Sequence, residues 1–110
     1  MITESEVEKA CEFLRTNARH LAKAKADRVY LEAFLRSKKA LLMQQANKGT
    51  VADREAFAYG HPEYLALLDG LKVAVEAEER LRWLMVAAQI KTEVWRSQES
   101  TNRTIDKSHR

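Results

Sequence analysis

A long interval without helix breakers limits the folds open to this chain: no Gly and no Pro occurs in residues 5–48. Ala, Leu, Glu, Lys, Arg and Gln dominate this interval, and these residues have favourable helix propensities. Thr3 and Glu6 have the spacing of a capping box, and Gly49 marks the end of the interval. The sequence therefore predicts one helix over about residues 4–48, which at 1.5 Å per residue is roughly 65 Å long.

A second long helix is predicted over about residues 62–100. In the segment "GHPEY", Pro62 suits the first helical position, where its missing N–H costs nothing, and Glu63 suits the positive end of the helix dipole. His61 is then a candidate cap. We expect residues 101–110 to form a frayed tail.

Residues 50–60 separate the two long helices and have the composition of a short third helix. Thr50 is a candidate N-cap, and we expect Phe57 or Tyr59 to pack over this elbow. The sequence thus predicts a single all-α domain over residues 1–110. Its predicted architecture is a long antiparallel helical hairpin, similar to a coiled coil, with a short elbow helix.

The second long helix carries more apolar surface than a lone hairpin needs, because a hairpin needs only one narrow seam on each helix. Its first seam comprises Leu67, Leu71, Ala74, Leu81, Met85, Ala88 and Trp95, and a second seam on another face comprises Trp83, Ala87, Ile90 and Val94. We therefore predict that the hairpin associates into a helical bundle, as a homodimer or a larger homo-oligomer. The candidate interface residues are Leu81, Trp83, Met85, Ile90, Val94 and Trp95.

The apolar stripe of the first long helix is predicted to change face midway, so that the helix bends near residues 22–28 or its halves pack against different neighbours. The first set is Val7, Cys11, Leu14, Ala18 and Leu21, and the second set, about 100° around the helix, is Leu31, Leu35 and Leu42. Cys11 is interpreted as a small buried hydrophobe. Because it is the only cysteine, no intrachain disulfide can form, which favours a reducing cytoplasm.

Residue sets suited to catalysis or metal binding are not recognised in the sequence. The three His residues lie on separate predicted elements, and the three Gly residues are isolated rather than part of a phosphate-binding loop. The acidic run at residues 76–79, beside Arg80 and Arg82, is typical of a solvated, salt-bridged helix face. We therefore expect a protein that is not an enzyme and has no cofactor or metal site.

The N-terminal stretch "MITESEVEK" is acidic and lacks the apolar core of a secretory signal. No uninterrupted apolar run approaches the ~18 residues of a membrane span. The expected location is the cytoplasm, which would be the host cytoplasm for a phage-encoded protein.

Positive charge is concentrated in one part of the first long helix, beginning with "RTNARHLAKAKADR". Residues 15–39 contain eight Lys or Arg and two acidic residues, a local net charge of +6, whereas the rest of the chain carries −3. Arg15, Arg19 and Lys23 recur every four residues and form a row that is suited to a phosphate backbone. The candidate nucleic-acid-binding residues are Arg15, Arg19, Lys23, Lys25, Arg28, Lys38 and Lys39. The alternative is a solvated face that pairs with acids of the second helix, and the hairpin register places Arg28 opposite Glu78 or Glu79.

The segments "DRVYLEAFLRSKKALLM" and "EYLALLDGLKVAVEAEERLRWLMVAAQIKTEVWRSQES" resemble small all-helical accessory proteins of tailed phages. In outline, the layout of a basic helix, an elbow and a long C-terminal helix is similar to UvsY-type recombination mediators. That resemblance implies a helical oligomer that binds single-stranded DNA and assists a recombinase.

Two hypotheses of function follow from these patterns. The first is a non-enzymatic, homo-oligomeric accessory protein of a phage or mobile element, which binds single- or double-stranded nucleic acid with little sequence preference in recombination or replication. The second is a protein-interaction module, such as an adaptor, scaffold or inhibitor of a host or phage protein, without nucleic-acid contact. Neither hypothesis involves a membrane.

Overall fold

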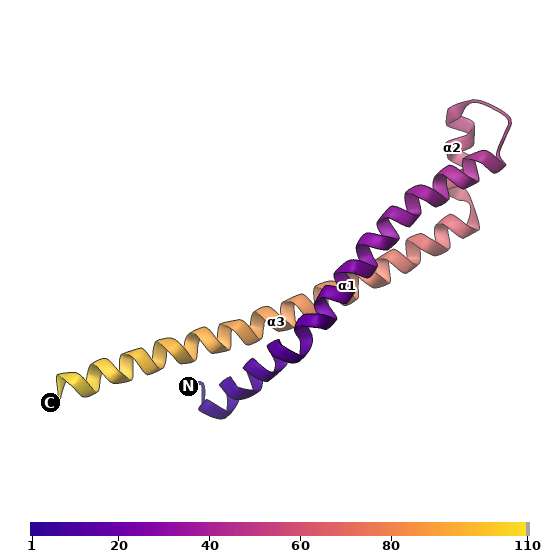
Figure 1. Ribbon diagram of the computed structural model, residues 1–110. Helices are drawn as coiled ribbons and strands as arrows, with labels where there is room; N and C mark the ends of the chain where they lie inside the picture. The colour runs from indigo at the N-terminus through magenta and orange to yellow at the C-terminus, as the bar shows by residue number, and fades with distance from the viewer. Residues whose placement is uncertain (110) are drawn as a thin grey trace. The chain divides into compact units, whose positions relative to one another are not determined.

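The computed structural model describes residues 1–109, which form three helices and no strand (Figure 1). Helix α1 spans Glu4–Gln45, α2 spans Val51–Gly60 and α3 spans Pro62–Ser108. The prediction of an all-α fold with two long helices and a short helix between them is confirmed.

Side-chain caps start the first two helices as predicted. At α1, the Thr3 backbone N–H donates to Glu6 Oε2 and the Glu6 N–H donates to Thr3 Oγ1, both at 3.2 Å. At α2, Thr50 and Asp53 form the same reciprocal arrangement, with both donor–acceptor distances 3.1 Å. Each capping box satisfies backbone donors that have no partner within the helix.

His61 separates α2 from α3 and caps both. Its backbone N–H donates to the Ala58 carbonyl at 3.2 Å, and its Nδ1 accepts from the Glu63 N–H at 3.1 Å. Pro62 is the first residue of α3, as predicted, because proline lacks only a donor that this position leaves unused.

The far end of α3 differs from the prediction. The helix continues to Ser108 instead of ending near residue 100, so the segment expected to be a frayed tail is helical to that point. It contains no Gly or Pro, and the hydroxyls of Thr101 and Thr104 donate to carbonyls one turn earlier at 3.1 and 3.0 Å. Arg110, the last residue of the predicted tail, lies outside the described residues.

The described chain divides into two compact units. Unit 1 comprises Met1–Leu21 and Arg80–Arg110, and unit 2 comprises Ala22–Glu79. Unit 2 by itself is a helical hairpin, in which the later part of α1 and the first part of α3 run antiparallel and α2 joins them. Unit 1 pairs the first part of α1 with the later part of α3, and the Ile2 N–H donates to Gln98 Oε1 at 3.2 Å.

Along each long helix, buried and half-buried side chains recur at alternating intervals of three and four residues, the pattern of a coiled-coil seam. On α1 these seam positions are Val7, Ala10, Leu14, Asn17, Leu21, Ala24, Arg28, Leu31, Leu35, Lys38 and Leu42. On α3 they are Tyr64, Leu67, Leu71, Ala74, Glu78, Leu81, Met85, Ala88, Thr92, Trp95 and Glu99. The first seam predicted for the second long helix is therefore confirmed.

The predicted change of face on α1 is wrong within each unit, because seam positions keep the spacing of three and four residues both in residues 7–21 and in residues 24–42. The two parts of α1 do pack against different neighbours, since they belong to different units that divide between Leu21 and Ala22. A seven-residue repeat drifts by about 20° per heptad relative to an ideal helix. When each residue is assumed to turn the helix by about 100°, Leu31, Leu35 and Leu42 fall on a different face from Val7, although all four are seam positions. Cys11, predicted to be buried, is exposed, and Ala18 is exposed as well.

The elbow of unit 2 buries less than expected. Ala58 is the buried residue of α2, whereas Phe57 and Tyr59 stay exposed. The Tyr59 ring nevertheless meets the Tyr64 ring edge-on, with centroids 5.4 Å apart, and Phe57 meets His61 at 5.6 Å. The two aromatic side chains thus cover the α2–α3 junction from the solvent side.

Gly49 holds the turn before α2 in a left-handed conformation with φ 95°. A Cβ at this position would lie 3.0 Å from Asp53 Oδ2, within the capping box. We expect Gly49→Ala to lower the free energy of unfolding by about 1–2 kcal/mol, because alanine disfavours this backbone conformation. Gly70→Ala is the matched control: its Cβ meets open space within a helix, so it should add about 0.5–1 kcal/mol. Urea unfolding measures the stability of both variants. Equal losses in the two would contradict a left-handed conformation at Gly49.

Candidate interaction surfaces

Arg28, a candidate nucleic-acid contact, lies in the helix seam of unit 2. Its Nε donates to Glu78 Oε2, its Nη2 to Glu78 Oε1 at 3.3 Å and its Nη1 to Glu32 Oε1 at 2.9 Å. The Arg28 and Glu78 side chains are only 24% and 11% exposed. The hydrogen bonds that Arg28 donates to Glu78, and then the one to Glu32, raise the pKa of Arg28. The predicted register, with Arg28 opposite Glu78, is confirmed. The Arg28 guanidinium is occupied by these hydrogen bonds and is not available to a phosphate.

The two lysines of the predicted second basic group also serve unit 2 internally. Lys38 Nζ lies 2.6 Å from Glu63 Oε2 of α3, and this ion pair lowers the pKa of Glu63. Lys39 Nζ lies 3.5 Å from Glu55 Oε1 of α2 and 4.7 Å from the centroid of the Tyr59 ring. Hydrogen bonding to Tyr59 and the charge of Glu55 raise the pKa of Lys39. Both lysines join α1 to neighbouring helices, so neither is a fully available cation.

The other four candidate cations remain exposed on α1 and pair with no residue of α3. In unit 1, Arg15 pairs with Glu12 one turn earlier, and in unit 2, Lys23 Nζ lies 2.8 Å from Asp27 Oδ2. Such exposed pairs within one helix contribute little stability and are easily exchanged. Among the described residues, Arg19 and Lys25 form no ion pair. Sequence reasoning did not assign Glu12 to Arg15, although the three-residue spacing was visible.

The six candidate interface residues divide into two groups. Leu81, Met85 and Trp95 occupy seam positions of α3 and are half-buried within unit 1, so they serve the pairing of α3 with α1. The other three are largely exposed, with Trp83 at 59%, Ile90 at 53% and Val94 at 41%. The second predicted seam is therefore left uncovered by the chain itself.

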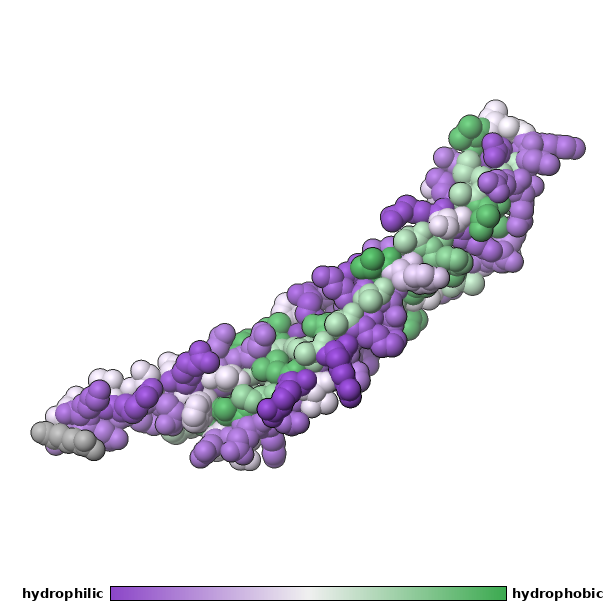
Figure 2. Space-filling view, viewed as in Figure 1, coloured by the Kyte–Doolittle hydropathy of each residue, from purple (hydrophilic) through white to green (hydrophobic). Residues whose placement is uncertain are grey.

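This uncovered surface belongs to unit 1, and we call it the α3 face. It comprises Trp83, Leu84, Ala87, Ile90 and Val94, all exposed. Arg82 lies over the Trp83 ring, with the guanidinium carbon 4.9 Å from the centroid. Figure 2 shows hydrophobic side chains reaching the surface between hydrophilic ones.

A groove between α1 and α3 of unit 1 borders the α3 face and shares two of its residues. It has a volume of about 290 Å³. Its lining residues are Glu6, Lys9, Ala10, Phe13, Leu84, Ala87, Ala88 and Lys91. The small side chains on both helices make an apolar floor, and charges of both signs stand at the edges.

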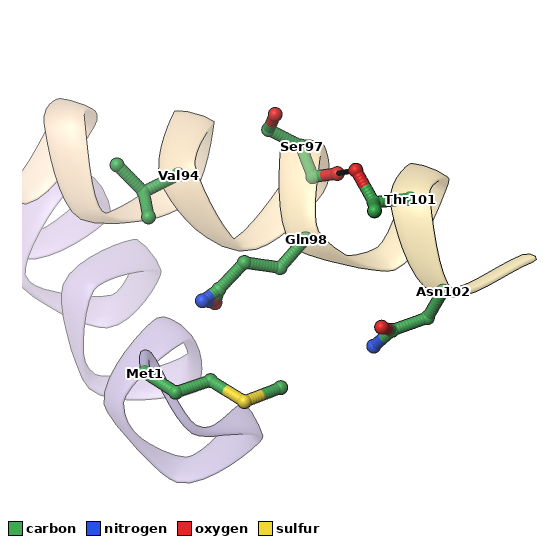
Figure 3. A pocket seen from close by; sticks show the side chains of 6 residues that line it. All are labelled: Met1, Val94, Ser97, Gln98, Thr101 and Asn102. Atoms are coloured by element: carbon green, nitrogen blue, oxygen red, sulfur yellow. Dashed lines mark hydrogen bonds between the residues drawn. The ribbon is translucent and has the colours of Figure 1, made fainter. Parts of the chain in front are cut away.

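A second hollow of unit 1, of about 360 Å³, lies beside the N-terminus and reaches Val94 of the α3 face (Figure 3). Met1, which precedes α1, and Gln98 of α3 border it, and Ser97, Thr101 and Asn102 complete its lining. The Thr101 hydroxyl donates to the Ser97 carbonyl at 3.1 Å, so its hydrogen is used within the helix. None of these six lining residues has a charged side chain.

Unit 2 also presents apolar side chains to solvent. Tyr30 and Phe34 on α1 are exposed and stack one turn apart, with ring centroids 6.0 Å apart. On α3, Leu68 and Val75 are exposed around a shallow groove that also includes Lys72. Exposed apolar surface is thus a property of both units.

The described residues contain no group of three or more His, Cys, Asp or Glu side chains placed to hold a metal ion. In the same part of the chain, none of the helices combines the length and apolar character that crossing a membrane requires. No protein-family model, curated protein or solved structure matches the chain.

Proposed function

We propose that this chain is a non-enzymatic accessory protein that binds nucleic acid with little sequence preference through exposed cations of α1. The supporting observation is that four cations of this helix are not neutralised by α3: Arg15 and Arg19 in unit 1, and Lys23 and Lys25 in unit 2. Lys and Arg that reach phosphate oxygens add affinity without reading bases. The phage recombination or replication role implied by the resemblance belongs to this proposal.

Fluorescence anisotropy with labelled single- and double-stranded oligonucleotides at several salt concentrations tests the proposal. We expect binding that weakens steeply with salt. The double variants Arg15→Ala/Arg19→Ala and Lys23→Ala/Lys25→Ala should each lower the slope of log Kobs against log salt by about 1.4 on single strands, at about 0.7 per phosphate contact.

Each unit supplies its own matched control of equal charge change. Arg96→Ala/Arg103→Ala removes two exposed arginines of unit 1, and Lys48→Ala/Lys72→Ala removes two exposed lysines of unit 2. Both controls should leave the salt slope nearly unchanged. Absence of binding at low salt, or equal losses in test and control variants, would contradict nucleic-acid contact by α1.

The exposed apolar side chains of both units favour a second candidate function, a protein-interaction module without nucleic-acid contact. On soluble proteins, large exposed apolar patches often mark sites where another protein binds. This function is supported if the chain shows no nucleic-acid binding at low salt while substitutions on the α3 face still change its association with protein.

A further inference from the structure

The α3 face is exposed beside an interior that holds very few large apolar side chains. The buried apolar residues of unit 1 are Val7, Ala10 and Ala88. The larger Trp83, Ile90 and Val94 lie outside this interior. A helix with apolar side chains on two faces normally buries both. Helix α1 therefore leaves the apolar side chains of the α3 face exposed.

The exposed surface of the chain, taken over both units, is large for its mass. The chain exposes 8263 Å². A compact monomer of 12.6 kDa exposes only about 6,200 Å² by the usual scaling of surface with mass. The excess, about 2,000 Å² for one chain, is larger than the roughly 800 Å² that each partner buries in a standard protein–protein interface. The chain therefore carries enough surplus surface for a stable dimer.

The order of side-chain sizes on the α3 face suits a second copy of the same helix. Ala87 and Ile90 lie at equal distances along the helix from a point between residues 88 and 89, and so do Trp83 and Val94. About a two-fold axis through that point, Ala87 meets Ile90 and Trp83 meets Val94 of an antiparallel copy. Each layer then joins a larger side chain to a smaller one, as close packing requires.

We infer that the α3 face binds a second copy of this chain in antiparallel orientation, about a two-fold axis between residues 88 and 89. Two copies of unit 1 then form a four-helix arrangement, and an isologous contact of this kind closes on itself. The neighbouring groove, with Lys9, Lys91 and Glu6 at its edges, supplies a rim of both charge signs. This inference does not depend on nucleic-acid binding.

Disulfide formation between single-cysteine variants tests the orientation. The background is Cys11→Ser, because Cys11 is exposed and would otherwise react. Ala87→Cys and Ile90→Cys chains, distinguished by a tag, are co-refolded in equal amounts and mildly oxidised. Disulfides require Cα atoms within about 7 Å, so the products report which residues face each other. We expect the mixed 87–90 product to exceed the half that random pairing gives.

Three results would overturn the inference. Predominance of the two like-with-like disulfides would indicate parallel copies. Mixed product at the random level would mean that the two-fold axis lies elsewhere. Cross-linking no greater than that of Gln89→Cys, an exposed position on another side of α3, would mean that the face binds no second copy and is left for a different protein. Anisotropy with the same chains then reports separately whether nucleic-acid binding persists.

Discussion

Leu42→Ala is expected to lower the free energy of unfolding by about 2–5 kcal/mol. Leu42 is the only large side chain in the described structure that is completely buried, with 0% exposure. It occupies the last seam position of α1 in unit 2, where the interior is small. Truncation removes apolar contact and leaves a cavity, and few neighbouring side chains are available to refill it.

Urea unfolding followed by circular dichroism, at one fixed chain concentration, measures this loss. Leu41→Ala is the matched control, since it makes the same chemical change one residue earlier, where the side chain is 52% exposed. The control should change stability by at most about 1 kcal/mol. Similar losses in the two variants would show that Leu42 does not occupy the interior.

Arg28→Met is expected to destabilise unit 2 more than the double variant Arg28→Met/Glu78→Met. The single change leaves the Glu78 carboxylate in the seam, 11% exposed, without its counter-charge. The double change removes both charges and leaves two flexible apolar side chains in their place. Breaking one member of a partly buried pair costs more than replacing the whole pair.

The urea midpoints of wild type, both single variants and the double variant form a complete mutant cycle. Glu78→Met alone should be milder than Arg28→Met, because Arg28 retains Glu32 at 2.9 Å. Arg28→Met should therefore have the lowest midpoint of the four chains. A double variant that is less stable than Arg28→Met would contradict the placement of this pair in the seam.

Local chemistry made the helix starts predictable. The Thr3–Glu6 spacing, Thr50 and the His61–Pro62 pair each specify a short-range hydrogen bond or backbone restriction, and the structure contains all of them. The end of α3 was harder to predict, because residues 101–108 are polar and exposed. Composition alone did not distinguish a solvated helix from a frayed tail there.

The seam residues of α1 were misassigned because the prediction used the number of residues per turn of an isolated, straight helix. Val7, Leu14, Leu21, Leu35 and Leu42 are separated by multiples of seven, and that repeat was visible in the sequence. Arg28 interrupts the repeat, and its polarity conceals a seam position. The interpretation of Cys11 as buried followed from the same error.

The residues of the candidate surfaces could be predicted from the sequence. Which of them contact another helix of the chain and which face solvent could not. Spacing alone identified two apolar seams on α3, and register suggested that Arg28 faces Glu78. Which seam α1 covers depends on how the two helices pack. Similarly, Lys38 and Lys39 became internal because Glu63 and Glu55 approach them only after the elbow folds.

Light scattering coupled to gel filtration tests most directly whether the second apolar seam requires a second copy of the chain. We expect wild type to elute with twice the mass of one chain. Ile90→Glu should shift it toward the single-chain mass, because a charge would be buried in the α3 face. Gln89→Glu, which adds the same charge at a neighbouring exposed position, should leave the dimer intact. Wild type at the mass of one chain, or equal dissociation by both variants, would contradict a dimer through the α3 face.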